Sequence, residues 1–514
     1  MPRSSILYQN PQNTIFLLDI PTSIVLAQNV SPIQQESPSD SLKPISNKHV
    51  CTRHLLSSTP LRDPYPGSTE PKTEAARAKV LQRIPVSERE IHDTISPLVK
   101  EALHDIRGGL GGDEWCSERK ALVQDSRRDD TAAHRPKGNV SLGKRSRKSN
   151  ESNGNHDCRF PVVEEDFTDS TVPGKSTELQ RSLQLGNPPL VLSPGLNLLD
   201  SMSGLCNLVV RNTSPDHATV TAGCELERHR DDSIEPAYAE HHGHHTYFVP
   251  PLSSFLLCKL PISQVTTEPN RCIDPIPGLP RDRRFDLILL DPPWANRSVQ
   301  RSRHYHTQHY LQGDLLTQRI RDILRVHLKD SPRIFRWDTS PDDRISVPRP
   351  TEKQTRGSIA AIWITNSAKA RKIAYDAIQA AGLSVCEEWI WIKTTTNGDP
   401  ITPLDGIWRK PYEVLVIGMR QHPQQQAGLR EKRGDGVIMR RFIAAVPDVH
   451  SRKPNLKEVF EKVFFADAFP SSRFEDRMVY SALEVFARNL TAGWWACGDE
   501  ALKFNSEEWW VHAK

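Results

Sequence analysis

Strand-like and helix-like segments alternate through the carboxy-terminal half of this 514-residue chain, and the alternation limits the folds that are open to it. The apolar run 285–290 predicts a buried strand, and a helical pattern follows over about 313–329. Parallel strands need a long crossover connection, which is usually a helix. The order therefore predicts an α/β fold with a mostly parallel, doubly wound sheet that is covered on both faces.

The same alternation continues to the end of the chain. Strands are predicted over 359–365, 385–393, 413–418 and 481–486, and helices over 367–381 and 455–463. Gly382 is expected to end the first of these helices, and Pro454 to lie in the first turn of the second.

The tetrapeptide Asp291-Pro292-Pro293-Trp294 directly follows the strand predicted over 285–290. In open α/β sheets, ligands bind beyond the carboxyl ends of the strands. The Asp291 carboxylate and a Pro292 carbonyl held inward by the stiff turn could accept both hydrogens of an exocyclic amino group on a planar base. Trp294 would offer a stacking face to an unpaired base, a contact worth roughly 1–3 kcal/mol. The alternative is that two prolines after a strand form only a loop.

Several further motifs occur in a fixed order around this tetrapeptide. They are Asn296, Ser298, Val299 and Arg301 directly after it, WIWIK at 389–393, PLD at 403–405, KPYE at 410–413, VP at 446–447, HSRKP at 450–454, and EVFARNL at 484–490 with Gly493 and Trp494. With these motifs, residues 245–510 resemble the MTA-seventy family of S-adenosylmethionine-dependent adenine amino-methyltransferases, and within it the methyltransferase-like four subgroup. The resemblance implies a Rossmann-like class I methyltransferase domain over 245–512. Its motif order is circularly permuted, because the tetrapeptide precedes the cofactor segment.

The resemblance also implies roles for individual side chains. By position in the motifs, Asp291, Pro292, Pro293 and Trp294 are catalytic; Lys453, Glu484, Arg488, Asn489, Asp499 and Glu500 bind S-adenosyl-L-methionine; and Asn296, Ser298, Arg301, Lys393 and Lys410 contact the substrate. A capping or surface charge is the alternative for each cofactor residue. Lys259 stands where the family usually has an acidic residue beside the cofactor, so the motif lacks that contact.

The function indicated is methylation of the exocyclic amino group of adenine in nucleic acid. The substrate is either RNA, such as small nuclear RNA whose adenosine is already 2′-O-methylated, or DNA. A catalytically silent nucleic-acid-binding or partner subunit is the main alternative, and the intact tetrapeptide favours the enzyme. Methylation of another planar amine or a protein amide is a third and less favoured interpretation. No RNA-recognition, zinc-finger or homeodomain pattern decides between the polymers.

The amino-terminal half is expected to be largely disordered. Residues 30–75 and 125–190, within a linker region over 29–240, are rich in Ser, Pro, Asn and charge and lack a sustained apolar period. Residues 1–28 are expected to form a small apolar segment with two strands, or a strand and a helical turn. One helix is predicted over 87–107, with Ser87 as its N-cap and Glu90 three residues on.

Two polar segments, 331–357 and 464–479, lengthen connections within the carboxy-terminal half. Connections of about 2–6 residues are usual in such folds. Each segment is therefore expected to be a surface insertion or a translated intron.

Charge and cysteine content bear on location and partners. The net charge of +4 neither demands nor excludes nucleic acid, but the basic cluster 144–148 suggests nuclear import, so the chain is expected in the nucleus, with or without a cytoplasmic pool. Nine cysteines without a C-x-x-C pair indicate reduced thiols in an intracellular protein. The histidines at 241–245 are expected in a solvated loop and not at a metal site. No secretory signal or membrane span is predicted, and the oligomeric state is left open.

Overall fold

The computed structural model describes residues 4–28, 53–66, 70–71, 73–112, 114–122, 188–223, 244–261, 274–294, 313–330, 357–407, 409–420, 438–465 and 480–512. The chain divides into one compact unit of Met1–Lys120 with Gly186–Lys514 and a second of Ala121–Leu185. Apart from Ala121 and Leu122, the described residues all belong to the first unit.

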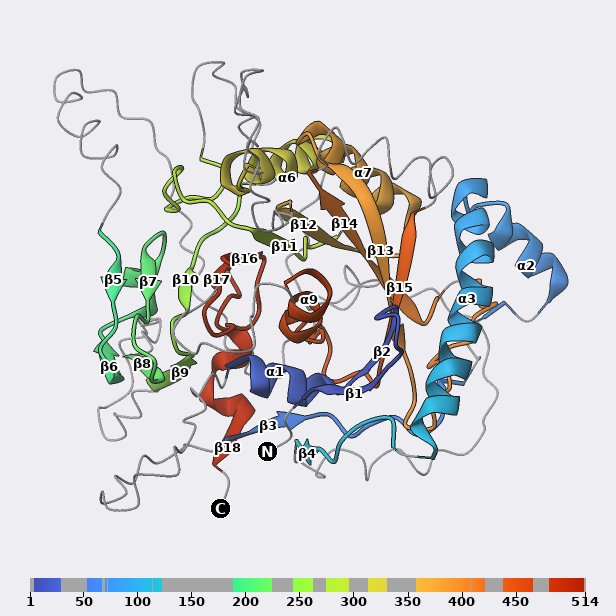
Figure 1. Ribbon diagram of the computed structural model, residues 1–514, viewed down its shortest axis with the longest axis horizontal. Coiled ribbons are helices and arrows are strands. Elements are labelled where there is room, and N and C mark those ends of the chain that lie inside the picture. Colours follow the sequence, from blue (N-terminus) through green and yellow to red (C-terminus); the bar gives the residue numbers. More distant parts are fainter. Residues whose placement is uncertain are drawn as a thin grey trace, which may run out of the picture. The chain divides into compact units, whose positions relative to one another are not determined.

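A large mixed sheet forms the centre of the first unit (Figure 1). In spatial order the twelve strands formed by the described residues are β1 (Ile6–Gln9), β2 (Ile15–Leu18), β15 (Met439–Ala445), β13 (Ser384–Lys393), β14 (Tyr412–Met419), β12 (Ile359–Ile364), β11 (Leu287–Leu290), β16 (Ala482–Val485), β17 (Trp495–Cys497), β10 (Ser254–Leu256), β7 (Val209–Arg211) and β5 (Leu190–Val191). The run from β12 to β10 is parallel throughout. Strand β14 is antiparallel to both of its neighbours, so the fold is α/β with a mixed sheet.

Helices cover both faces of this sheet, as the sequence predicted. Successive side chains of a strand point to opposite faces. Leu287 and Leu289 of β11 accordingly pack in one core with α1 (Ile20–Gln28) and α9 (Lys457–Phe464). Ile288 and Leu290 pack in the other core with α3 (Val86–Leu110), α6 (Gly313–His327) and α7 (Ala368–Ala380).

Most elements predicted in the carboxy-terminal half are present. The five predicted strands are β11, β12, β13, β14 and β16, and the three predicted helices are α6, α7 and α9. Gly382 follows α7 with a φ of 78°, a left-handed conformation that favours glycine. Pro454 precedes α9 and does not lie in its first turn, because the helix begins only at Lys457. Strand β15 was not predicted.

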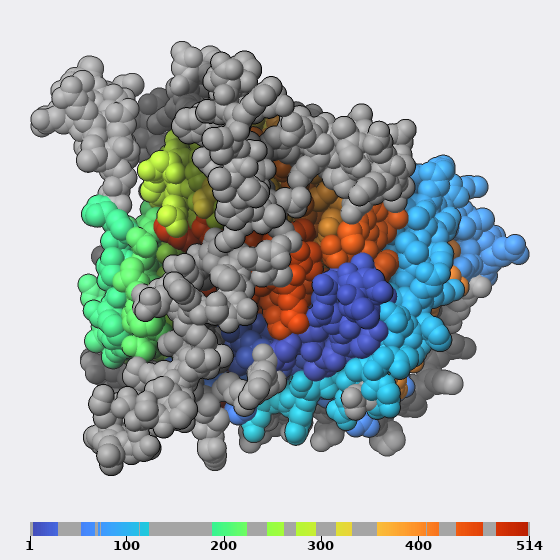
Figure 2. All heavy atoms as spheres, in the orientation of Figure 1, coloured from blue at the N-terminus to red at the C-terminus, as the bar shows by residue number. Residues whose placement is uncertain are grey.

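The small apolar segment over 1–28 is part of the large sheet. Strand β2 pairs in parallel with β15, and β1 pairs antiparallel with β2. The helix α1 follows β2. Of the two predicted alternatives, the strand followed by a helix is therefore confirmed, and the second run does not form a strand. Figure 2 shows this segment, in dark blue, lying against orange carboxy-terminal residues and the light-blue α3.

The expectation of a linker over 29–240 is wrong for several described stretches. These contain β3 (Arg53–Ser57), α2 (Glu74–Leu81), α3, β5, β6 (Gly195–Leu199), η2 (Met202–Leu205), β7 and β8 (Ala218–Gly223), while β4 (Lys120–Ala121) lies at the boundary between the two units. The predicted helix over 87–107 is α3, but Pro85 occupies the cap position without a side-chain hydrogen bond, so Ser87 lies inside the first turn. Short strands without a long apolar period escaped the sequence prediction.

The remaining strands of the described residues form two small sheets, one of which contains the last strand of the chain. Strand β3 pairs with β18 (Trp510–His512), which follows η4 (Lys503–Asn505) and η5 (Glu507–Trp509). Strand β9 (His244–Val249) pairs with β8, so His244 and His245 lie in a strand and not in the loop that was expected. The basic cluster 144–148, residues 331–356 and residues 466–479 lie outside the described residues. No helix in the described part of the chain is long and apolar enough to cross a membrane.

Candidate active site

Four segments meet at the carboxyl edge of the parallel strands. Asp291 follows β11, and Arg488 lies three residues beyond the end of the neighbouring β16. Glu413 lies at the start of β14, which reaches the same edge because it runs antiparallel to β12. Lys453 comes from the connection between β15 and α9. The topology thus brings together residues that are far apart in the sequence.

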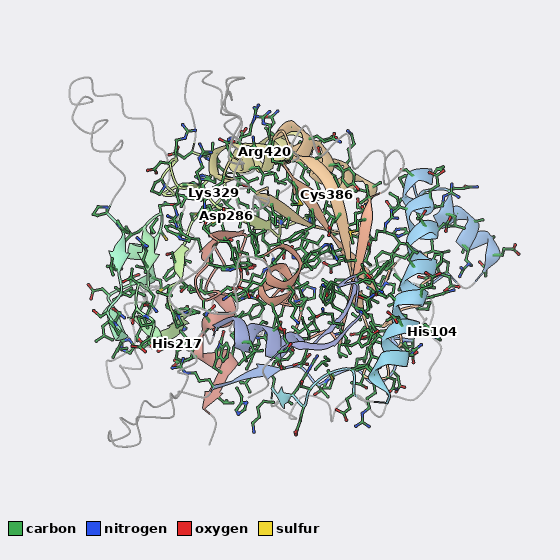
Figure 3. All side chains as sticks on the ribbon, viewed as in Figure 1. His104, His217, Asp286, Lys329, Cys386 and Arg420 are labelled. Carbon is green, nitrogen blue, oxygen red and sulfur yellow. The ribbon has the colours of Figure 1, made fainter. Side chains whose placement is uncertain are left out.

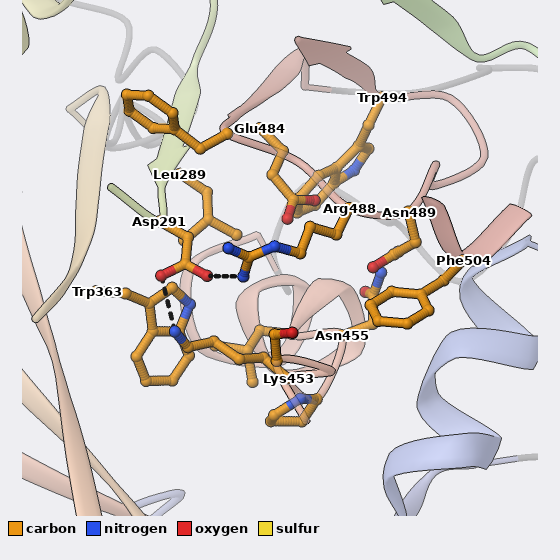
Figure 4. Close-up of a pocket in the computed structure, with 14 residues that line it drawn as sticks. Leu289, Asp291, Trp363, Lys453, Asn455, Glu484, Arg488, Asn489, Trp494 and Phe504 are labelled. Atoms are coloured by element: carbon orange, nitrogen blue, oxygen red, sulfur yellow. Dashed lines mark hydrogen bonds and ion pairs between the residues drawn. The ribbon is translucent and has the colours of Figure 1, made fainter. Parts of the chain in front are cut away.

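Two cations hold the Asp291 carboxylate (Figure 4). Lys453 Nζ lies 2.7 Å from Oδ1, and Arg488 Nη1 lies 3.3 Å from Oδ2. The side chain of Asp291 is only 14% exposed, so both contacts are poorly screened by water. The carboxylate is therefore held by one cation on each of its two oxygens.

The ion pairs continue on both sides of Asp291. Lys453 Nζ also lies 3.3 Å from Glu413 Oε2, and Lys393 Nζ lies 2.6 Å from Glu413 Oε1. On the other side, Arg488 Nε donates to Glu500 Oε2 at 2.9 Å. Positive and negative groups alternate along this network, so each charge has an opposite neighbour.

The pKa values follow from this alternation. Burial opposes ionisation of Glu413, but the ammonium groups of Lys453 and Lys393 outweigh it and lower the pKa of Glu413 to about 2. Burial likewise opposes the charge of Lys453, and the carboxylates of Asp291 and Glu413 outweigh it, so the pKa of Lys453 is raised. Both groups are charged at neutral pH.

Glu484 is the exception at this edge. It has no ion pair within the described part of the chain, and burial, followed by the negative charge of Asp291, raises its pKa to about 8. Its carboxyl group is therefore mostly protonated at neutral pH and can donate a hydrogen bond.

A small cavity of about 30 Å³ lies among these side chains. Its lining includes Asp291, Trp363, Lys453, Glu484, Arg488 and Asn489. The Asn489 side-chain nitrogen Nδ2 is buried and has no hydrogen-bond partner. An unpaired buried donor costs free energy, so this amide is suited to an acceptor brought by a ligand.

The Pro-Pro turn differs in part from the prediction. The Pro292 carbonyl already accepts a hydrogen bond from the Trp294 backbone N–H at 2.8 Å, which leaves one lone pair for another donor. The Trp294 indole Nε1 donates to the Trp363 carbonyl at 2.8 Å, and its ring packs partly against the core. Trp294 is therefore an anchored residue, and stacking of its ring on a base stays a prediction.

Several predicted site residues lie elsewhere. Lys410 Nζ donates to the Leu404 carbonyl, and its nearby carboxylates include Asp93 and Asp405 instead of Asp291. Asp499 and Lys259 are exposed and do not line the cavity. The predicted substrate residues Asn296, Ser298 and Arg301 fall outside the described residues.

Sequence reasoning missed three residues of this edge. Glu413 links Lys393 to Lys453, and its place in the KPYE motif was the available signal. Trp363 anchors Trp294, and its ring centroid lies 5.1 Å from Lys453 Nζ. Phe486 has a φ of 61°, unusual for a bulky residue, and lines the cavity directly after β16. No sequence signal marks Trp363, whereas Phe486 lies in the EVFARNL motif at 484–490.

Residues 342–500 match the MT-A70 family. The chain carries an MT-A70 domain. This confirms the resemblance inferred from the motifs. The match includes Lys393, Glu413, Lys453 and Arg488 but begins after the tetrapeptide that contains Asp291.

Proteins similar to this chain include the N6-methyladenosine RNA methyltransferase MTA1 of Cryphonectria parasitica. It is 36% identical over 45% of this chain and 55% of its own length. The N(6)-adenine-specific methyltransferase METTL4 of Homo sapiens is 30% identical over 52% of this chain and 45% of its own. A DNA N6-methyl methyltransferase of Caenorhabditis elegans is 27% identical over 44% of this chain and 48% of its own. Each match spans about half the length of the relative.

Proposed function

We propose that this chain is an S-adenosyl-L-methionine-dependent methyltransferase, with a Rossmann-like class I fold in permuted order, that methylates the exocyclic amino group of adenine in nucleic acid. The observation that carries the proposal is the position of Asp291. It stands at the carboxyl edge of parallel strands and contacts both Lys453 and Arg488 directly. The names of the MT-A70 relatives, which act on adenine in RNA or DNA, support the same activity.

The side chains around the cavity fit the proposed cofactor. Lys453 and Arg488 are cationic and suit a carboxylate, whereas protonated Glu484 and the unpartnered amide of Asn489 suit hydroxyl and carbonyl oxygens. S-adenosyl-L-methionine supplies an electrophilic methyl group when bound, and these four residues would hold it. A volume of about 30 Å³ has room for little more than one water molecule, so the side chains must separate on binding.

The residues of the chain have separate tasks in this proposal. Asp291 accepts a hydrogen of the amino group, and Lys453 fixes the orientation of that carboxylate. The free lone pair of the Pro292 carbonyl accepts the second hydrogen. Trp294, held at its indole nitrogen, offers the remaining face of its ring to the base. Preorganised acceptors of this kind stabilise the charge that develops on nitrogen.

The test is the rate of methyl transfer in Asp291→Asn. The variant keeps the shape of the side chain but loses the charge, so turnover on adenine-containing RNA or DNA should fall by about 10²–10³. Asp286→Asn is a matched control, because Asp286 lies near the opposite end of the same strand and pairs with Lys329. Retention of more than half of wild-type turnover in Asp291→Asn would contradict the assignment.

The wild-type protein also tests the second candidate, a silent partner subunit. That function predicts nucleic-acid binding without methyl transfer to RNA or DNA. Mass spectrometry of N6-methyladenosine in both polymers, including RNA whose adenosine is 2′-O-methylated, identifies the substrate. Nuclear localisation is also part of the proposal, and it rests on the basic cluster 144–148.

A further inference from the structure

A second cavity, of about 500 Å³, lies at the opposite edge of the sheet. Its lining includes Arg211, Arg283, Arg284 and Trp495. Arg211 ends β7 and is paired with Ser254 at the start of β10, which in turn is paired with Trp495 at the start of β17. The two other arginines precede β11. The cavity therefore lies at the amino-terminal edge of the strands whose carboxyl edge holds Asp291.

The indole ring of Trp495 orients two of the arginines. The Cζ atom of Arg283 lies 4.8 Å from a ring centroid of Trp495, and that of Arg211 lies 5.8 Å from it. Guanidinium groups favour such positions because the aromatic face is negative. Both cations are thus held at the cavity without the help of a carboxylate.

The positive charge here is not balanced by ion pairs. Within the described part of the chain neither Arg211 nor Arg283 has a salt bridge, and Arg211 Nε is buried without a hydrogen-bond partner. Arg284 donates to the Arg325 carbonyl, which is neutral. Asp282 is the one acidic residue in the lining. Burial and the charge of Arg211 lower the pKa of Arg283, as expected for neighbouring like charges.

Asp286, the acidic residue directly before β11, is already paired. Asp286 Oδ2 lies 2.7 Å from Lys329 Nζ and accepts hydrogen bonds from the backbone and side chain of Ser481. Figure 3 shows Asp286 and Lys329 close together beneath α6. This carboxylate is therefore committed elsewhere, and the arginines retain their capacity for an external anion.

We propose that this arginine cavity binds a backbone phosphate of the nucleic-acid substrate. Guanidinium groups bind phosphate with paired hydrogen bonds, and the volume admits a phosphate with its sugar. Seven residue steps separate Arg284 from Asp291, or about 23 Å at the strand rise of about 3.3 Å, so the phosphate belongs to a nucleotide several positions from the target adenine. The identity of the polymer rests on the proposed function, whereas the phosphate chemistry does not.

The test measures binding of a fluorescein-labelled single-stranded RNA to the full chain, without cofactor, over a range of salt concentrations. In the Arg211→Gln, Arg283→Gln double variant the affinity should fall roughly tenfold or more, because hydrogen bonds to charged groups are removed. The slope of log affinity against log salt should become shallower by about 0.7 for each phosphate of the single strand that the arginines no longer neutralise. The same measurement with DNA of equal sequence compares the two polymers.

The matched control is Arg77→Gln with Arg83→Gln, which removes the same charge from α2 and the turn after it. In Figure 1, α2 lies on the side of the molecule opposite β7. This control should keep wild-type affinity and slope. Thermal melting of each variant checks the fold, and a double Lys variant, which keeps the charge but loses the planar fork, should bind with intermediate affinity.

Unchanged affinity and slope in the folded Gln variant would overturn the proposal. Inorganic phosphate that binds the cavity in wild type, with no loss of RNA or DNA binding in the Gln variant, would assign it to small anions and also overturn the proposal. These results are independent of the Asp291→Asn rate, so failure of the proposed chemistry and failure of the phosphate site are distinguishable.

Discussion

The two edges of the central strands differ in how their charged side chains are paired. At the carboxyl edge, Asp291 and Glu413 each contact two cations, and the charges compensate one another within the chain. At the amino edge, Arg211 and Arg283 stack on an aromatic ring and have no carboxylate partner among the described residues. Charges that are paired within the chain stabilise the geometry of their own side chains. Arginines without a carboxylate partner remain able to bind an anion from another molecule. The carboxyl edge is therefore suited to catalysis, and the amino edge is suited to binding an anion of the substrate.

Lys453→Met is expected to change the free energy of unfolding more than the other substitutions. The substitution leaves Asp291 and Glu413 with one cation each, so the free energy of unfolding should fall by about 2 kcal/mol, less than the 3–5 kcal/mol for a buried charge left wholly unpaired. Denaturant unfolding measures the change. Lys100→Met on the exposed face of α3 is the control and should be nearly neutral.

A loss below about 0.5 kcal/mol in Lys453→Met, within the range of ordinary surface substitutions, would show that the carboxyl-edge network contributes little. The distinction between the two edges would then have no energetic basis. The result would leave the proposed cofactor contact of Lys453 untouched, because binding is a separate measurement.

Glu484→Gln tests a carboxyl-edge acid that has no ion pair among the described residues. The folded pKa of about 8 lies above the ordinary value of 4.5, so the folded state retains a proton that the unfolded state releases. The stability of the wild type relative to Glu484→Gln should therefore fall as pH rises from about 4.5 to 8, by at most about 1.4 kcal/mol per pH unit, and then level off. Unfolding of both proteins across this range gives the difference.

The contribution of Glu413 to the free energy of unfolding is expected to depend on pH with the opposite sign and in a different pH range. Its pKa is lowered to about 2, so its contribution to stability is complete above about 4.5 and is lost as pH falls toward 2.

A pH-independent difference in the free energy of unfolding between wild type and Glu484→Gln would contradict the protonated state of Glu484.

The smallest predicted effect is at the amino edge. Arg283→Gln removes a stacking interaction worth about 0.5–1 kcal/mol at an exposed site, and it also relieves repulsion from Arg211, so the free energy of unfolding should change by less than about 0.5 kcal/mol. Thermal and denaturant unfolding measure it. A loss as large as that of Lys453→Met would mean that Arg283 is a structural residue with an internal partner, and the contrast between the edges would fail.

The sequence predicted the carboxy-terminal half well because its elements are long and strongly periodic. Strand β12 is wholly buried, and β13 and β14 each contain a continuous buried stretch. A continuous apolar run between polar turns is a clear signal. The motif order also located Asp291, Lys453 and Arg488, which the fold brings into contact.

The amino-terminal elements escaped prediction because their stability is not local. Strand β5 has two residues and β7 three, and such runs become strands only when a neighbour supplies hydrogen bonds. The Trp294 anchor to the Trp363 carbonyl and the placement of Lys410 away from Asp291 depend on side-chain directions in the folded state. The arginine cavity escaped for the same reason, since its residues come from four separate segments.

The amino-terminal segment also sets a constraint on the time course of folding. Ser23 Oγ accepts a hydrogen bond from the Asn455 backbone N–H, across 432 positions of sequence, and the Ala27 carbonyl accepts one from Ala492. At about 5–20 residues per second, the ribosome needs roughly 20–90 seconds to make the chain between such partners. During this interval the apolar faces of β2 and α1 have no β15 or α9 to cover them. A nascent chain of this protein therefore depends on chaperones or rapid local collapse to protect these residues until β15 and α9 have been made.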